Sequence, residues 1–535
     1  MSHGRDAVSA NDLRRRGRRP SRRATAAVSL GLLLGTGLPL EHGGAAASRA
    51  APGAEVPITP VDQRRNLAHN SPMLLADPTE ERFVVAATRL DNPDFGCALH
   101  VSGDGGRSWV PAQPIAKLPE GADKCYAPEV AFDDEGTLYY LFVGLAGEGN
   151  SPAGAYLVTS SDRAVTFSAP RQVLGPERYM VRMAVDRSAG RRGRLHLVWL
   201  QASSDPPLGG LPPPPNPIMA AYSDDGGRTF SEPVQVSDPR RQRVVAPALA
   251  IGPDHRVHVL YYDLEDDVRD YQGLEGPRWE GRWSLVMSTS TDGGRRFGRG
   301  VVVDDQVVPP ERVMLIYTMP PPSLGADGAG RVFAAWHDAR NGDWDVFVRR
   351  SLDRGRSWQA ARRVNDDRLG NGRHQYLPRL AVSPGGRLDA VFYDRRNDRA
   401  NVRNDVVFTS SRDSGRSFTP NAKLTTESSN SQVGIRYPIP SARGQVEFGS
   451  RLGLLSERTA ALASWPDTRH SDPDGARQEV RSVRVEELPG LGGSRPPWLA
   501  VAAVSALLAL GAGGYAARRR RRGRPSPAPP PPAAG

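Results

Sequence analysis

One eight-residue phrase recurs six times along this chain of 535 residues and limits the folds that the chain can adopt. A clear copy reads Ser102-Gly-Asp104-Gly-Gly106-Arg-Ser108-Trp109. Asp and Ser side chains bond backbone N–H groups in turns, and Gly accepts a positive φ, so the phrase predicts a tight turn between two strands. Its aspartates, spaced 58, 63, 67, 61 and 60 residues apart, are Asp104, Asp162, Asp225, Asp292, Asp353 and Asp413. A regular spacing of about 60 residues predicts a repeat architecture.

The phrase resembles the Asp-box (BNR) repeat, S-x-D-x-G-x-T/S-W/F, of the sialidase (neuraminidase) superfamily. One copy departs from the pattern, because Ala164 stands where the other copies have Gly. The resemblance implies an all-β propeller over residues 48–488, in which the boxes are structural turns between the third and fourth strands of a blade.

A second recurring pattern, called the strand landmark, gives the number of blades. A short apolar strand, followed ten residues later by the start of another, begins at Pro72, Pro128, Val181, Pro247, Pro322, Pro378 and Ser450. We therefore predict seven blades, with six as the alternative if the last unit is an irregular cap. The last unit supplies only three strands, so we expect residues 56–61 to add the fourth and to close the propeller.

The two ends of the chain predict export and anchoring. Residues 1–47 resemble a signal peptide, either cleaved or kept as an anchor, because an Arg-rich segment precedes an apolar run and small residues. A linker over 489–497 leads to 498–517, which carry no charge and are long enough for a transmembrane helix. The basic and Pro-rich tail at 518–535 is expected to be cytoplasmic, which places the propeller outside a cell membrane that the chain crosses once.

The formal net charge of +11 belongs to these ends. Residues 1–23 and 518–535 hold 14 arginines and two aspartates, so the span between them is almost neutral and nucleic acid is not an expected partner. Cys97 and Cys125 are candidates for a disulfide in an exported protein, with two unpaired thiols as the alternative. No metal-ligand pattern is present, so we predict neither a metal nor another cofactor.

Residues at matching positions of the blades suggest a site near the centre of the propeller. The charged residues directly after the strand landmarks are Glu129, Arg182, Arg379 and Arg451, and the aromatic residues two positions before them are Tyr126, Tyr179, Tyr376 and Phe448. Guanidinium groups clamp carboxylates and aromatic rings stack on sugar rings, so this set predicts binding of an acidic sugar. The alternative is that the same residues form ion pairs and packing between blades.

The resemblance also implies roles in hydrolysis. Sialidases clamp the substrate carboxylate with three arginines and use a tyrosine nucleophile, a glutamate that activates it and an aspartic acid. By position, Arg182, Arg379 and Arg451 correspond to the clamp. Glu129 with Tyr126, Tyr376 or Tyr437 corresponds to the nucleophile pair, and Asp91 or Asp94 to the acid. The Phe/Tyr-Arg-Ile-Pro motif of that family is missing before the first box. The nearest string lies much later and adds Arg436 and Tyr437 as substrate-binding candidates.

A further set, Asp338-Ala-Arg340, Asp394-Arg-Arg396 and Asp467-Thr-Arg469, recurs in the last three blades. It predicts either ligand contacts or an Asp–Arg clamp that orders each loop, and its repetition favours the clamp. Taken together, the sequence predicts a membrane-anchored, monomeric propeller that recognises glycans and can hydrolyse them as an exo-sialidase does. The alternatives are a non-catalytic module that binds protein or a cell-wall polymer, and a purely structural surface protein.

Overall fold

The computed structural model describes residues 51–59, 67–148, 150–188, 190, 193–202, 214–268, 279–309, 321–434, 448–472, 475–486 and 535. The predicted signal peptide, linker, transmembrane helix and all but the last residue of the tail lie outside these residues. So do the candidates Arg436 and Tyr437. Within the described part of the chain, no helix is long and apolar enough to cross a membrane.

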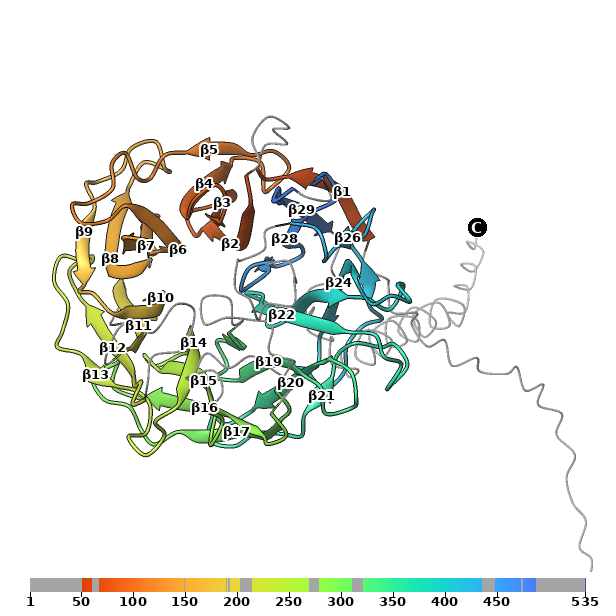
Figure 1. The fold of residues 1–535 in the computed structure, drawn as a ribbon. Helices are drawn as coiled ribbons and strands as arrows, with labels where there is room; N and C mark the ends of the chain where they lie inside the picture. The colour runs from red at the N-terminus through yellow and green to blue at the C-terminus, as the bar shows by residue number, and fades with distance from the viewer. Residues whose placement is uncertain are drawn as a thin grey trace, which may run out of the picture. The chain divides into compact units, whose positions relative to one another are not determined.

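Seven antiparallel sheets surround a common centre, as predicted (Figure 1). Each sheet is one blade, and its strands follow one another from the centre to the rim. In Figure 1 the inner strands β2, β6, β10, β14 and β22 lie nearest the centre, whereas β5, β9, β13, β17 and β21 form the rim. The fold is therefore a seven-bladed propeller, and the six-bladed alternative is wrong.

Blade 1 consists of β2 (His69–Asp77), β3 (Glu80–Leu90), β4 (Gly96–Ser102) and β5 (Val110–Ala112), and blade 2 of β6 (Lys124–Phe132), β7 (Leu138–Ala146), β8 (Ser151–Ser160) and β9 (Arg171–Leu174). Blade 3 consists of β10 (Arg178–Asp186), β11 (Arg194–Gln201), β12 (Ile218–Ser223) and β13 (Val234–Gln235). Blade 4 consists of β14 (Val244–Ile251), β15 (Val257–Asp263), β16 (Trp283–Ser290) and β17 (Val301–Val307). Blades 5 and 6 consist of β18 (Ser323–Ala326), β19 (Val332–Asp338), β20 (Asp345–Ser351) and β21 (Arg362–Arg363); and β22 (Gln375–Val382), β23 (Leu388–Asp394), β24 (Arg403–Ser411) and β25 (Ala422–Lys423), with β26 (Ser429–Asn430) paired to β24. Blade 7 consists of β27 (Gly453–Ser456), β28 (Ala461–Asp467), β29 (Glu479–Glu486) and β1 (Ala51–Pro57).

The N-terminal strand completes the last blade. Strand β1 pairs with β29 in antiparallel register, from Ala51 opposite Glu486 to Pro57 opposite Arg481. The closure was predicted, but the strand lies about five residues earlier than the expected range of 56–61. Ile58 and Thr59 follow β1 and both bond the carbonyl of Val480, which extends the contact beyond the strand.

Apolar side chains from the middle strands pack between adjacent blades and form the core. The second strands contribute Trp199, Trp336 and Trp465, which are among the largest side chains with no exposed surface. Trp199 packs with the side chains of blades 2 and 3, and Trp465 with those of blades 6 and 7. This interleaved packing makes each blade depend on its neighbours, because neither face of a single sheet is covered by the blade itself.

The six copies of the recurring phrase, called the box turns below, join the third and fourth strands of blades 1 to 6, as predicted. In the first, the Ser102 hydroxyl donates to Asp104 Oδ1 at 2.7 Å and accepts the N–H of Gly106 at 2.8 Å. Asp104 also accepts the N–H groups of Arg107 and Ser108, each at 2.9 Å. Burial opposes the shift, but these hydrogen bonds lower the pKa of Asp104 to about 2.

Both the backbone conformation of the box turn and the space left by a neighbouring blade require glycine at this position. Gly106 has a φ of +87°, and a Cβ there would lie 2.6 Å from the side chain of Leu462 in blade 7. Each turn therefore also contacts the blade before it. The loops between second and third strands, and those between blades, emerge at the opposite end of the propeller because neighbouring strands are antiparallel. This end is called the loop face below.

The repeated Asp-x-Arg set forms clamps on the blades. Arg340 bonds both oxygens of Asp338 and reaches Asp304 in the outer strand of blade 4 at 2.9 Å. Arg469 makes the same contacts with Asp467 and with Glu55 of β1. The clamp interpretation of this set is therefore the one that the structure supports.

Candidate functional site

A backbone irregularity in the inner strands places the candidate residues. The register of β6 with β7 shifts between Tyr126 and Glu129, and the residue before the landmark, Ala127, has a φ of +48°. The same irregularity recurs in blades 1, 3, 4 and 6, where the left-handed residues are Ser71, Met180, Ala246 and Leu377. Such a bulge redirects the side chains that follow it. It separates the aromatic position before the landmark from the charged position after it.

The charged positions of three blades meet at Glu129. Its Oε1 accepts a hydrogen bond from Nη1 of Arg182 at 3.2 Å and another from Nη1 of Arg451. The Glu129 side chain is only 3% exposed, and those of Arg182 and Arg451 are 13% and 9% exposed. The two arginines also donate to main-chain carbonyls: Arg182 to Pro247 at 3.2 Å and Arg451 to Pro128 at 2.7 Å. The structure therefore brings Glu129, Arg182 and Arg451 together, in ion pairs between blades that the alternative interpretation also predicts.

Arg379 belongs to the same group through its charge. Burial alone raises the pKa of Glu129, but the charges of Arg451, Arg182 and Arg379 outweigh it and hold that pKa below its ordinary value. Burial and the charge of Arg451 lower the pKa of Arg379 to about 10, with Glu129 opposing them. Arg379 therefore remains a cation at neutral pH. Glu129, Arg182, Arg379 and Arg451 are called the arginine cluster below, and its formal charge is +2.

A small pocket opens beside the arginine cluster on the loop face. Its volume is about 40 Å³, and its polar lining includes Arg89, Tyr126, Arg178, Tyr179, Arg182 and Arg451. One water needs roughly 10–15 Å³ measured in this way, so the pocket holds about three waters or one carboxylate group. A sugar ring has to lie outside the pocket, since ligand-sized sites measure about 300 Å³ or more.

A larger cavity, of about 570 Å³, lies at the box-turn end of the inner strands. Its walls come from blades 1 to 5 and include Met73, Val130, Met183 and Leu249. Beside it, His255 Nδ1 lies 3.0 Å from Asp186 Oδ2 and 2.8 Å from the Ser188 hydroxyl. Both groups contact the same ring nitrogen, and Ser188 donates to Asp186, so the three residues do not form a nucleophile–base relay.

Asp91, one of the two candidate acids, is held in a buried ion pair, whereas Asp94 is exposed. Nε of Arg89 donates to its Oδ1 at 2.6 Å, and Asn70 Nδ2 donates to its Oδ2 at 2.7 Å. The side chains of Arg89 and Asp91 are 2% and 0% exposed. An acid must reach the leaving group, so this arrangement argues against the predicted role, which stays a prediction.

Arg89 is the site residue that sequence reasoning missed. Its Nη1 donates to the hydroxyl of Tyr126 at 2.9 Å, and its guanidinium carbon lies 4.9 Å from the centre of the Tyr126 ring. The signal was present in the sequence, because residues two apart in a strand point to the same side. The spacing of Arg89 and Asp91 therefore predicts their ion pair.

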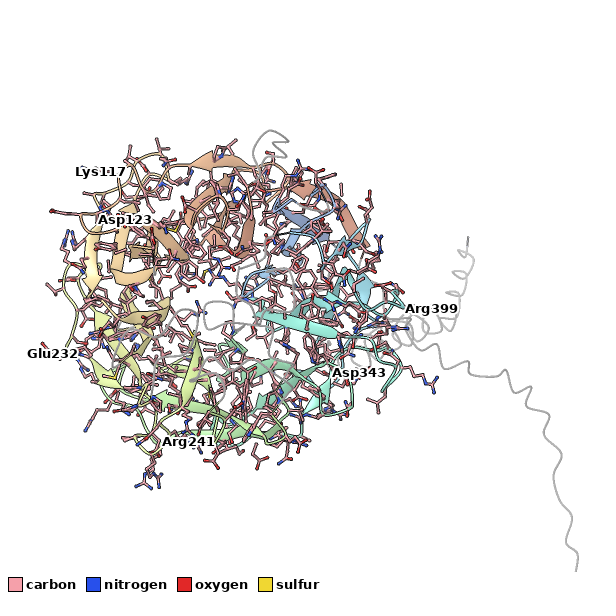
Figure 2. All side chains as sticks on the ribbon, viewed as in Figure 1. Lys117, Asp123, Glu232, Arg241, Asp343 and Arg399 are labelled. Atoms are coloured by element: carbon pink, nitrogen blue, oxygen red, sulfur yellow. A yellow bond between two sulfur atoms is a disulfide. The ribbon has the colours of Figure 1, made fainter. Side chains whose placement is uncertain are left out.

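The aromatic candidates divide into two groups. Tyr126 and Tyr179 line the pocket beside the arginine cluster. Tyr376 and Phe448 belong instead to a packed group in blades 5 to 7, in which Tyr393 lies 5.3 Å from Tyr376 and 5.5 Å from Phe448 between ring centres. This group also includes Trp344, whose neighbour Asp343 lies toward the outside of the propeller in Figure 2. The structure therefore does not bring Tyr376 or Phe448 to Glu129.

The two cysteines form a disulfide between Cys97 in β4 and Cys125 in β6, with their Cα atoms 5.6 Å apart. The bond joins blades 1 and 2 directly beside Tyr126. In the part of the chain that the structure describes, no group of three or more His, Cys, Asp or Glu residues is arranged to hold a metal ion.

No model of a known protein family matches this sequence, and neither does any curated protein. Solved structures similar to the chain include the phage phi92 endosialidase, which is 11% identical and has a TM-score of 0.45 over 83% of this chain and 70% of that chain. A polysaccharide lyase that acts as an ulvan lyase is 13% identical, with a TM-score of 0.45 over 79% and 95% of the two chains. A Hadza microbial sialidase is 13% identical, with a TM-score of 0.40 over 76% and 74%. At these scores the likenesses carry no argument about function.

Proposed function

We propose that this protein binds carboxylate-bearing glycans at the centre of its loop face. The observation that carries the proposal is the arginine cluster, in which guanidinium groups from blades 3, 6 and 7 meet around the single carboxylate of Glu129. A buried excess of two positive charges is unfavourable unless an anion neutralises it. The adjoining pocket has the size of one carboxylate.

Arg379 is the member of the arginine cluster with the most capacity left to receive an anion, although it is not among the residues that line the pocket. Among the described residues it has no hydrogen-bond or ion-pair partner, while Arg182 and Arg451 already donate to Glu129 and to main-chain carbonyls. Hydrogen bonds to charged groups contribute about 1.5–3 kcal/mol each. Capture of a carboxylate would therefore stabilise a guanidinium that has no hydrogen-bond partner among the described residues.

The described residues support binding rather than hydrolysis. Cleavage of a glycosidic bond needs a group that can donate a proton to the leaving oxygen. None of the described residues that line the pocket is a carboxylic acid, and both Glu129 and Asp91 are held in ion pairs. Exo-sialidase activity would need an acid from elsewhere, with Tyr126 as nucleophile. Export by residues 1–47, anchoring by 498–517 and a monomeric state complete the proposal, and they rest on the sequence.

The test is calorimetric titration of the full chain, in detergent, with N-acetylneuraminate, with glucuronate and with their methyl esters. We expect the acids to bind and the uncharged esters to bind at least tenfold more weakly. Arg379→Ala should weaken the acids about tenfold or more. It should not lower the unfolding free energy, since it removes one charge of the buried excess and breaks no hydrogen bond to another described residue. Arg356→Ala, in an exposed part of a box turn, is the matched control.

Equal binding of acids and esters, or no binding of either acid, would contradict the proposal. Release of the fluorophore from a fluorogenic sialoside, abolished by Tyr126→Phe, would add hydrolysis to the binding function.

A further inference from the structure

Two groups that line the pocket from different blades are joined by a chain of hydrogen bonds. Tyr126 lies in the inner strand of blade 2, and Arg451 lies two residues before the inner strand of blade 7. Between them stands blade 1, whose residues Ser71 and Arg89 also line the pocket. The inference below rests on the proposed function, because it concerns how this pocket is kept ready for an anion.

The chain can be followed from the phenol. Arg89 donates to the hydroxyl of Tyr126 at 2.9 Å and to Asp91 at 2.6 Å. Asp91 accepts from Asn70 Nδ2 at 2.7 Å, and the other end of the Asn70 side chain, Oδ1, accepts from the Ser71 hydroxyl at 2.9 Å.

The second half of the chain reaches blade 7. The Ser71 hydroxyl accepts the N–H of Ser450 at 3.0 Å, and the Ser71 carbonyl accepts from Nε of Arg451 at 3.2 Å. Gly449 makes this approach possible, because a Cβ on Gly449 would lie 2.5 Å from the Ser71 hydroxyl and 2.7 Å from its main-chain nitrogen. Every link from Tyr126 to Arg451 is therefore a direct hydrogen bond, a covalent bond or a main-chain step.

Nearly all of this chain of hydrogen bonds is shielded from water. Counted over whole residues, Asn70, Ser71, Arg89 and Asp91 are 0%, 4%, 1% and 6% exposed. Hydrogen bonds among buried, charged and polar groups are strong and directional, and they fix the atoms that they join. Tyr126 is fixed in addition by the edge of the Phe95 ring, 5.1 Å away between ring centres, and by the disulfide of its neighbour Cys125.

We propose that Arg89, Asp91, Asn70 and Ser71 are positioning residues that set Tyr126 and Arg451 at the separation a bound acidic sugar requires. In this reading Asp91 acts through Arg89 and never exchanges a proton with the ligand. Its negative charge keeps Arg89 aimed at the phenol. Ser71 carries the same restraint across the junction between the first and the last blade.

Ser71→Gly interrupts the chain of hydrogen bonds and leaves the backbone conformation accessible. Ser71 has a φ of +51°, which glycine adopts readily, and its removal takes away only the hydroxyl that links Asn70 to Ser450. Ala246→Gly is the matched control, because Ala246 has the same place in blade 4 and a φ of +56°. We expect the affinity for N-acetylneuraminate to fall about five- to tenfold in Ser71→Gly and to stay within twofold in Ala246→Gly. Ser71→Gly should also lose some stability, because Asn70 Oδ1 and the Ser450 N–H lose the hydroxyl as a partner.

Asp91→Asn supplies a second test, with Asp338→Asn as its control. Both aspartates are buried and each pairs with an arginine two residues away, but Asp338 lies in blade 5 and its partner Arg340 does not line the pocket. Both variants should lose stability, and only Asp91→Asn should lose affinity, by about tenfold. Wild-type affinity in both Ser71→Gly and Asp91→Asn would overturn this inference alone. A wild-type chain that binds no acidic sugar would overturn the proposed function and this inference together.

Discussion

Replacing Glu129 with glutamine should expose the uncompensated charge of the arginine cluster. The substitution keeps the shape of the side chain and removes its charge, so three guanidinium groups are left with no carboxylate between them. At 3.2 Å and an effective dielectric constant of about 20, one ion pair of this kind amounts to about 5 kcal/mol before desolvation is counted. Removal of one partner from a buried pair costs about 3–5 kcal/mol in practice. We expect Glu129→Gln to lose that much unfolding free energy.

The same variant should regain stability from added anions. Its cluster carries a formal charge of +3, so sulfate is expected to occupy the site and to stabilise the folded state by RT ln(1 + [L]/Kd). At ten times the dissociation constant this amounts to about 1.4 kcal/mol. Sulfate also stabilises proteins by exclusion from their surface, so the gain has to be compared with that of a control.

The assay is denaturant unfolding of wild type, Glu129→Gln and Asp338→Asn, each in sodium sulfate and in sodium chloride of equal ionic strength. Asp338 is also fully buried beside an arginine, but Arg340 keeps a second carboxylate, Asp304, at 2.9 Å. The sulfate gain should be largest in Glu129→Gln. An unfolding free energy within about 1 kcal/mol of the wild type, or an equal sulfate gain in both variants, would refute the reasoning about the cluster.

Three further predictions concern the scaffold. Burial lowers the pKa of five histidines to about 3 or 4, and the unfolded chain, with values near 6.5, takes up protons first as the pH falls. The contribution of these histidines to the unfolding free energy should therefore be fully present above pH 6.5 and smaller by about 2 kcal/mol per histidine at pH 5. Equal melting temperatures at pH 7.5 and pH 5 would contradict this prediction. The histidines are His69, His100, His258, His337 and His374. Ala164→Gly should raise the unfolding free energy by about 0.5–1 kcal/mol, because Ala164 holds a φ of +65° in its box turn, and a loss of stability would count against this strain. Reduction of Cys97–Cys125, which closes a loop of 28 residues, should lower the unfolding free energy by about 3–4 kcal/mol, and equal unfolding curves with and without reductant would disagree.

The number of blades could be predicted because every blade repeats the same local signals. An inner hairpin needs its apolar strands and its turn in each copy, so the landmark survives even in blade 7, which has no box turn. The bounds of the closing strand could not be predicted as well. Strand β1 has a single neighbour, and its residues 52–54 are exposed, so no buried face fixes its register in the sequence.

The candidate site could be predicted at the positions after the landmarks and not at those before them. Glu129 and Arg182 follow bulges and meet Arg451, whereas Tyr376 precedes a bulge and packs with Tyr393. The sequence does not show the left-handed residue that divides the two positions, because Ala, Met and Leu occupy it as well as Ser. The ion pair of Asp91 with Arg89 could have been predicted, since residues two apart in a strand lie on the same side.

The pairing of β1 with β29 has a consequence for the order in which the protein is made. Ala51 faces Glu486, so β1 has to wait for its partner until the ribosome has added 435 further residues (486 − 51). Until then the last blade has an open hydrogen-bonding edge, and so has the waiting segment. Contacts this distant in sequence form slowly, and unpaired edges invite association with other chains. Synthesis at high concentration should therefore fail through aggregation of chains that are complete except for this final pairing.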